Sequence, residues 1–250
     1  MCRGYPIGSF LFWKLQKEDI AKSDEQDENK LNFQLYQFIT NYDERKPHNE
    51  KIYIEQIMRD ELYIVLDGQQ RLTSLYIGLK GTRILKKKGA RSDDPSAYEE
   101  KRLYLNLKHQ PNMDNPEDNY QFEFHAKAPK NDKKHFWFKV GDILELERGV
   151  LNYAQKHQKH GLEENELNLL EKLKDAFHTK QLISFFEEKE KNLNKVLNIF
   201  IRVNSGGVKL SYSDLLMSIL TASFSSDIRE KMNELVDALK DKGFPNVEQD

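Results

Sequence analysis

The chain has 250 residues, which is long enough to bury a substantial core in one large domain or two smaller ones. Hydrophobic residues make up 38% of it and 14 Phe and 11 Tyr are present, a composition that indicates a folded globular protein and excludes a disordered chain. The formal net charge of −2 supplies no overall attraction to nucleic acid, so any contact with DNA has to come from a local basic patch.

The cysteine content and the hydropathy pattern bear on the compartment. A single cysteine, Cys2, excludes an internal disulfide and fits a reducing environment, and it has no neighbouring histidine to activate it as a nucleophile. The sequence shows no signal peptide and no apolar run long enough to span a bilayer. We therefore expect a cytoplasmic protein with no membrane partner.

The N-terminal part predicts a series of strands separated by polar segments. A charged run over residues 17–30 indicates a solvated surface, and the basic residues 86–91 suit either a phosphate-contacting patch or the end of a helix. The four residues between 57 and 62 suggest that two of the strands form a hairpin. Strands are predicted over residues 5–13, 31–35, 51–57 and 62–66.

The segment from Leu62 to Leu79 predicts a strand, a tight turn and a helix. Leu62–Leu66 is apolar, aromatic or β-branched throughout, which is typical of a strand covered on both faces. Asp67-Gly68 is a turn signal, because glycine adopts backbone angles that other residues avoid. The apolar residues that follow recur at helical spacing, which predicts one buried stripe: Leu72, Leu75, Tyr76 and Leu79.

This turn has the chemistry of an anion site. The first turn of a helix presents unpaired N–H groups and the positive end of the helix dipole, and Gln69, Gln70 and Arg71 add side-chain donors for phosphate oxygens. A carboxylate at Asp67 is suited to hold Mg²⁺ beside a phosphate or to orient a water molecule. The plainer interpretation makes Asp67 an N-cap and leaves the other polar side chains in solvent.

The second half predicts three further strands and then helices. Strands are expected over residues 103–107, 120–124 and 135–140; the aromatic residues 136–138 on the last of them are either core or a surface for stacking bases. A helical pattern begins near residue 142 and includes residues 165–177 and 227–240, whereas residues 195–203 read as another buried strand. After that strand, Asn204-Ser-Gly-Gly207 suits a loop whose backbone N–H groups cradle a phosphate, with Arg202 as a possible surface ion-pair partner in the alternative interpretation.

Three ordered segments resemble one known family. Asp67-Gly-Gln-Gln-Arg71 is similar to the D-G-Q-Q-R motif of the GmrSD-type restriction endonuclease N-terminal domain, a ParB-like family. Arg3–Trp13 resembles that family's early glycine-rich strand, and Phe200–Leu210 resembles its F-x-R-x-N-x-G-G-x-x-L segment. Together these matches span most of the chain, which makes the resemblance fairly specific.

The resemblance implies an α+β fold, namely a ParB/sulfiredoxin-like mixed sheet with helices followed by a helix-rich portion. We expect residues 1–145 to form the α/β portion with the D-G-Q-Q-R motif and residues 146–250 to form the helix-rich portion. Relatives carry an I-P-x-Y-Q-R segment upstream and continue beyond residue 250, so both ends are expected to be truncated, and a nucleotide site in this chain could be incomplete.

The resemblance also implies a nucleotide-binding and nucleotide-hydrolysing domain of a modification-dependent DNA restriction protein that acts against phage. Mg²⁺ and a nucleoside triphosphate are the expected cofactor and substrate, and DNA and an HNH-type nuclease domain or subunit are the expected partners. Two alternatives stay open: a non-catalytic module that senses DNA or nucleotide and recruits a nuclease, and a ParB-like nuclease that itself cuts DNA. The oligomeric state is left open.

Specific residues take roles under this resemblance. Asp67, Gln70 and Arg71 are the expected catalytic residues, with Asp67 also the candidate ligand for Mg²⁺. The expected nucleotide-binding residues are Gly68, Gln69, Thr73, Arg202, Asn204, Gly206 and Gly207. The segment contains no G-x-x-x-x-G-K-[ST] sequence, so a P-loop enzyme is not expected.

Overall fold

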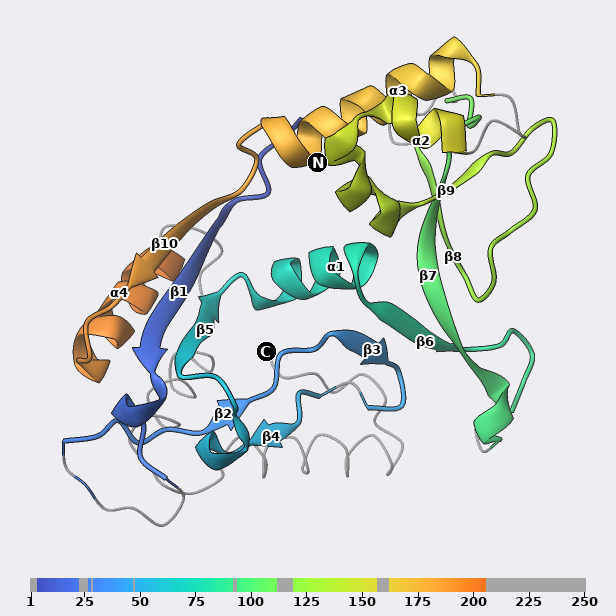
Figure 1. Cartoon of the computed structure of the whole chain (residues 1–250). Helices are drawn as coiled ribbons and strands as arrows, with labels where there is room; N and C mark the ends of the chain where they lie inside the picture. The colour runs from blue at the N-terminus through green and yellow to red at the C-terminus, as the bar shows by residue number, and fades with distance from the viewer. Residues whose placement is uncertain are drawn as a thin grey trace. The chain divides into compact units, whose positions relative to one another are not determined.

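A computed structural model describes residues 4–22, 27, 29–46, 48–91, 94–111, 119–156 and 162–205 (Figure 1). The chain forms two compact units whose segments alternate along the sequence. Of the described residues, the first unit contains 4–9, 38–49 and 69–184, and the second contains 10–37, 50–68 and 185–205.

The second unit is organised around a three-stranded sheet in the order β10-β1-β5 (Figure 1). The central strand, β1, is antiparallel to β5, and Leu15 lies opposite Leu62 while Leu11 lies opposite Asp67. Trp13 and Leu15 point into a core that also contains Ile54 and Val196. The elements are β1 (Ser9–Gln16), η1 (Lys17–Asp19), β2 (Leu35–Tyr36), β4 (Lys51–Ile52), η2 (Ile54–Gln56), β5 (Glu61–Asp67), β10 (Ser184–Glu188) and α4 (Leu193–Ser205).

The first unit is built on a five-stranded mixed sheet. Its longest strand, β7, pairs through its first half with β6 and through its second half with β8 and β9, all antiparallel, and β3 is parallel to β6. The elements are β3 (Asn41–Asp43), α1 (Gln69–Leu79), β6 (Thr82–Lys86), η3 (Pro95–Ala97), β7 (Tyr98–Asn106), β8 (Gln121–His125), β9 (Trp137–Lys139), η4 (Val140–Arg148), α2 (Val150–Lys156), α3 (Glu164–Lys174) and the π-helical turn η6 (Asp175–Thr179).

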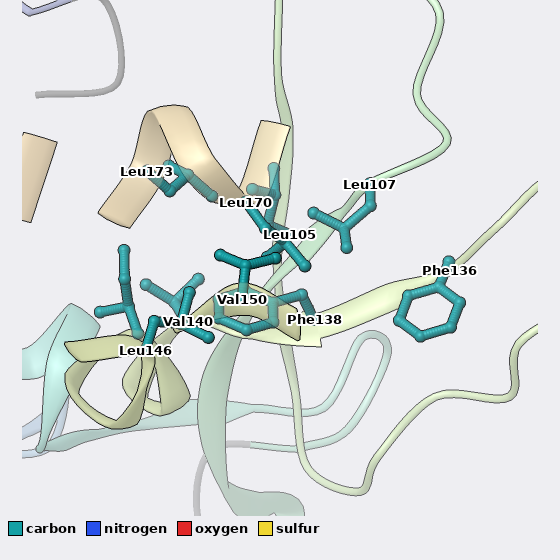
Figure 2. Close-up of a cluster of buried hydrophobic side chains, with 10 residues drawn as sticks. Leu105, Leu107, Phe136, Phe138, Val140, Leu146, Val150, Leu170 and Leu173 are labelled. Carbon is teal, nitrogen blue, oxygen red and sulfur yellow. The ribbon is translucent and has the colours of Figure 1, made fainter. Parts of the chain in front are cut away.

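The core of the first unit lies between this sheet and the helices that follow it in sequence. Figure 2 shows Leu170 and Leu173 of α3 directed toward Leu105 of β7 and Phe138 of β9. Leu146 of η4 is fully buried in the same cluster. The strand period of two explains this arrangement, because alternate residues of β7 and β9 face the helices and the intervening residues face the opposite side of the sheet.

Asn106 is the polar residue that holds the ends of three strands together. It is 2% exposed. Its Oδ1 accepts hydrogen bonds from the backbone N–H groups of Phe136 and Lys108, and its Nδ2 donates to Gln121 Oε1 at 2.9 Å and to the Lys134 carbonyl at 3.5 Å. One carboxamide therefore links β7 to β8 and to the segment before β9.

Replacing Asn106 with alanine is expected to lower the free energy of unfolding by roughly 3 kcal/mol, because the substitution leaves buried backbone donors without acceptors. Chemical denaturation of the wild-type chain and the variant measures the difference. Asn192, whose Oδ1 accepts one hydrogen bond in an exposed position, is the matched control, and Asn192→Ala is expected to cost less than half as much. An Asn106→Ala variant as stable as the wild type would contradict a bracing role.

The structure corrects several predicted strands. Residues 195–203 form part of helix α4 instead of a strand, and residues 51–57 divide into the two-residue β4 and the helical turn η2. The predicted hairpin is absent among the described strands, because β4 pairs with β2 while β5 pairs with β1. β5 is also an edge strand with Tyr63 51% exposed, so it is not covered on both faces.

The α+β class is confirmed, whereas the ParB-like assignment stays a prediction. The boundary near residue 145 also stays a prediction, and the predicted helix over residues 227–240 lies outside the described residues. Among the residues that the structure describes, no helix is long and apolar enough to cross a membrane.

Candidate functional site

The Asp67–Arg71 segment adopts the predicted order of strand, turn and helix. β5 ends at Asp67, which is half-buried and lies opposite Leu11 in the antiparallel register. Gly68 has a φ of 84°, in the region that other residues rarely adopt, and α1 begins at the next residue, Gln69. The prediction of a helix that starts directly after the Asp-Gly turn is confirmed.

Arg71 is held by a segment that precedes it by more than sixty residues. Its Nη1 donates a hydrogen bond of 3.2 Å to the carbonyl of Ile7, and the N–H of Ile7 in turn donates to the carbonyl of Leu182 at 3.0 Å. The guanidinium is therefore positioned within the first unit by backbone groups, in the first turn of α1.

Gly8 leaves the room that Arg71 occupies. Its φ is 96°, and a Cβ atom at this position would lie 2.3 Å from Arg71 Nη1. Real Cβ atoms do not approach other heavy atoms so closely, so a side chain here would push the guanidinium away from its position. Gly8 therefore belongs to the candidate site although it was not among the predicted site residues; it lies in the Arg3–Trp13 segment that resembles the family's glycine-rich strand.

The other end of α1 is fixed by two further close approaches. A Cβ on Gly141 would lie 2.4 Å from the carbonyl oxygen of Leu79, and one on Gly81 would lie 2.0 Å from that of Thr40. Tyr76 of α1 packs edge-on against Phe38, with ring centroids 5.7 Å apart. The C-terminal end of α1 is therefore closely packed against its neighbours.

Replacing Gly8 with alanine is expected to displace the Arg71 side chain and to weaken binding of an anion at the first turn of α1 about tenfold. The reason is the combination of the positive φ with the approach to Nη1. Titration of the chain with a polyphosphate measures the change. Gly89→Ala is the control, since Gly89 also has a positive φ, 79°, but has no atom near its Cβ position; a loss of equal size in both variants would contradict the role of Gly8.

The remaining predicted residues are distributed over both units. Gln69 and Gln70 are exposed in the first turn of α1, and Thr73 is half-buried in the next. Arg202 is exposed on α4 and Asn204 lies in the last turn of that helix. Gly206 and Gly207 lie outside the described residues, and the roles of all these residues stay predictions.

The hydrogen-bond donors at the start of α1 suit a phosphate group. A Mg²⁺ ion at this site would have few protein ligands. Within the described part of the chain, no group of three or more His, Cys, Asp or Glu side chains is placed to hold a metal ion. Asp67 is the carboxylate of the motif, and Mg²⁺ is commonly bound by one or two carboxylates together with substrate phosphates. The residues therefore fit Mg²⁺ that arrives with a nucleotide.

Two alternatives from the sequence are also tested. The basic residues 86–91 lie at the end of strand β6 and in the turn after it, so their interpretation as the end of a helix is wrong. Phe136 and Phe138 are 3% and 0% exposed, which makes them core residues and excludes them from stacking on bases. Trp137 lies between them in sequence and is half-buried, on the other face of the sheet.

With this geometry in view, the comparison with protein families is decisive. The model of the GmrSD restriction endonuclease N-terminal domain matches residues 1–221. The chain belongs to this family. The match includes the Arg3–Trp13 segment, the Asp67–Arg71 turn and α4, and it confirms the resemblance on which the site residues were selected. No individual curated protein matches the sequence.

Membership makes this a restriction protein of the defence type. It explains why the three similar segments occur in the same order as in the family.

Proposed function

We propose that this chain is the nucleotide-binding and nucleotide-hydrolysing domain of a DNA restriction protein, with the Asp67–Arg71 segment as its nucleotide site. The observation that supports this most is the position of Arg71: its guanidinium is held at the Ile7 carbonyl beside Gly8, in the first turn of a helix. A guanidinium fixed near the N–H groups of a helix start matches the charge and the hydrogen-bonding geometry of a phosphate.

Each residue of the segment takes a role in this proposal. The N–H groups of the first turn and the Arg71 guanidinium bind phosphate oxygens and stabilise the charge that develops during phosphoryl transfer. Gln69 is exposed at the start of the helix and contributes a carboxamide to the same oxygens. Asp67 or Gln70 orients the attacking water, and the carboxylate is the better acceptor for its proton.

Mg²⁺ would be held by Asp67 and by the nucleotide phosphates, and it would neutralise negative charge on the transferred phosphoryl group. Arg202, Asn204 and the glycines at 206 and 207 are proposed as further nucleotide contacts, on the basis of the family segment to which they correspond. Thr73 is proposed as a hydroxyl donor one turn further along α1.

The proposed partners are DNA, including modified DNA, and an HNH-type nuclease domain or subunit. The motif provides a single carboxylate, which is too few ligands for two-metal cleavage of DNA. We therefore assign cleavage to the partner nuclease, and nucleotide binding or hydrolysis in this chain would control it. The restriction family supports contact with DNA, and we propose a cytoplasmic location for a protein that acts on incoming phage DNA.

Phosphate release distinguishes hydrolysis from sensing. The intact chain is incubated with each of the four ribonucleoside triphosphates, with and without Mg²⁺, and the inorganic phosphate is measured over time. The proposal predicts Mg²⁺-dependent release from at least one triphosphate. Binding without any release, with or without DNA, would favour the sensing module. Cleavage of DNA by the chain alone would favour the third reading, a ParB-like nuclease.

A further inference from the structure

The connection between β8 and β9 is a basic, exposed segment of the first unit. It carries four lysines between His125 and His135, namely Lys127, Lys130, Lys133 and Lys134, and all four are exposed. Asp132 is the one carboxylate in the segment. The chain as a whole is slightly acidic, so this is a local concentration of positive charge and not a reflection of overall composition.

The single carboxylate is already engaged within the turn. Asp132 Oδ1 accepts hydrogen bonds from the backbone N–H groups of Lys134 at 2.7 Å and His135 at 2.8 Å, and His135 Nδ1 lies 2.9 Å from the same oxygen. The His135 ring, followed by these N–H groups, holds the pKa of Asp132 below its usual range. Asp132 therefore fixes the shape of the turn, and Lys133 and Lys134 stand at its tip.

Within the described residues, the ammonium groups of the four lysines form no ion pair. The ion pair at this turn joins Asp132 to His135, and neither lysine at the tip takes part in it. Their charge is therefore available to a partner in solution. By contrast, Lys87 in the other basic segment donates to the carbonyl of Ser96 at 2.8 Å.

The base of the turn is braced by rings and by a backbone contact. Asn131 Oδ1 accepts a hydrogen bond from the N–H of Trp137 at 2.8 Å. The Trp137 ring lies parallel to the His135 ring, with centroids 5.9 Å apart. The His125 ring packs edge-on against two rings, with centroids 5.0 Å from Trp137 and 5.8 Å from Tyr104. Lys133 and Lys134 are thus presented on a structured turn.

The charge continues along the neighbouring surface. Lys133 and Lys134 line an open cleft of about 580 Å³ that Lys108 and His109 also line. Of the two glutamates at its border, Glu166 is buried and accepts a hydrogen bond from the N–H of Glu163, so it caps its own helix α3. Glu163 is exposed at the same border, so three lysines, Lys108, Lys133 and Lys134, line the cleft together with one exposed glutamate and the exposed charge is net positive.

We propose that the β8–β9 turn, with Lys127, Lys130, Lys133 and Lys134, is a docking surface for the phosphate backbone of DNA. A turn with a fixed shape and several exposed lysines places cations at defined spacing, and each lysine that neutralises a phosphate releases a condensed counterion. Such contacts position a protein on a duplex without reading its sequence, which suits a protein whose discrimination between DNAs is exercised elsewhere. This inference rests on the proposed function in one respect, namely that the protein acts on DNA.

The test compares matched pairs of charge reversals in the intact chain. Lys133→Glu with Lys134→Glu changes two adjacent lysines at the tip of the turn, and Lys189→Glu with Lys191→Glu changes two exposed lysines that already pair with Glu187 and Asp19. Binding to an unmodified 30-base-pair duplex is measured by fluorescence anisotropy at a series of salt concentrations. An unmodified duplex is sufficient because backbone contacts do not depend on the bases.

The turn variant is expected to bind about 50-fold more weakly at 0.1 M salt, with a salt dependence shallower by about two counterions, whereas the control variant stays within about threefold of the wild type. Equal losses in both variants, an unchanged affinity in the turn variant, or no binding of the duplex by the wild type would each overturn the proposal. Circular dichroism and thermal melting confirm that both variants fold.

A parallel titration with nucleoside triphosphate separates this inference from the proposed function. The turn variant is expected to retain the nucleotide affinity of the wild type, because the four lysines are not part of the Asp67–Arg71 segment. If none of the proteins binds nucleotide while the turn variant alone loses affinity for DNA, the result supports the docking surface and contradicts the nucleotide site.

Discussion

Replacing Arg71 with alanine is expected to weaken nucleoside triphosphate binding about 100-fold. The guanidinium is held in the first turn of α1 by the Ile7 carbonyl, so it meets a phosphate without a further loss of side-chain freedom. Charge-assisted hydrogen bonds contribute about 1.5–3 kcal/mol each, and losing them in one step corresponds to about two orders of magnitude in affinity. Calorimetric titration in the presence of Mg²⁺ measures the effect.

Two further variants make this result specific. Arg71→Lys keeps the positive charge but cannot form two parallel hydrogen bonds, so an intermediate affinity is expected. Arg102→Ala removes an exposed arginine of β7 that pairs with Glu100 at 3.5 Å, and it should leave the nucleotide affinity unchanged. If the Arg102 and Arg71 variants lost equal affinity, the effect would be one of general charge and the assignment of Arg71 would be wrong.

Replacing Asp67 with asparagine is expected to reduce phosphate release about 1,000-fold while the fold stays intact. The substitution keeps the size of the side chain and removes the charge that orients water or holds Mg²⁺, and the loss of a general base typically costs a factor of about 10² to 10⁴. Asp67 occupies the last position of β5, where it lies opposite Leu11 beside a shift in the strand register. Steady-state kinetics on the variant gives kcat and KM separately.

Whether the Asp67→Asn substitution changes kcat or KM identifies the role of Asp67. A fall in kcat with KM unchanged indicates that Asp67 acts on the attacking water, whereas a rise in KM that high Mg²⁺ partly reverses indicates that it holds the metal. Asp60→Asn, at an exposed position just before β5, is the matched control and should have no effect. Phosphate release by Asp67→Asn at the wild-type rate would exclude a catalytic role for this carboxylate.

Local patterns in the sequence predict α1, the strands β8 and β9, and the second half of β7. In α1 the apolar residues recur every three or four positions after an Asp-Gly turn, and the predicted strand segments are rich in aromatic and aliphatic residues. The first half of β7, from Tyr98 to Arg102, is mostly charged and is not predicted as a strand.

Helix α4 shows where this reasoning fails. The run Val196–Val203 is rich in β-branched and aromatic residues, which favour a strand by propensity. The chain nevertheless forms a helix with Val196 buried in the core of the second unit, so tertiary packing outweighs local propensity.

The contacts that shape the candidate site are distant in sequence, so no local pattern could reveal them. Arg71 meets Ile7 and Gly8 across more than sixty residues, and β5 pairs with β1 instead of with its sequence neighbour. The positive φ of Gly68 was predictable from the Asp-Gly pair, whereas the space that Gly8 provides for a guanidinium depends on how the first unit folds.

The measurement that tests the nucleotide site most directly is a calorimetric titration of the wild-type chain with each of the four ribonucleoside triphosphates in the presence of Mg²⁺. The structure leads us to expect saturable binding of at least one of them, with one nucleotide per chain. The absence of saturable binding for all four would contradict a nucleotide site at Asp67–Arg71, and membership of the restriction family would then describe ancestry without this activity.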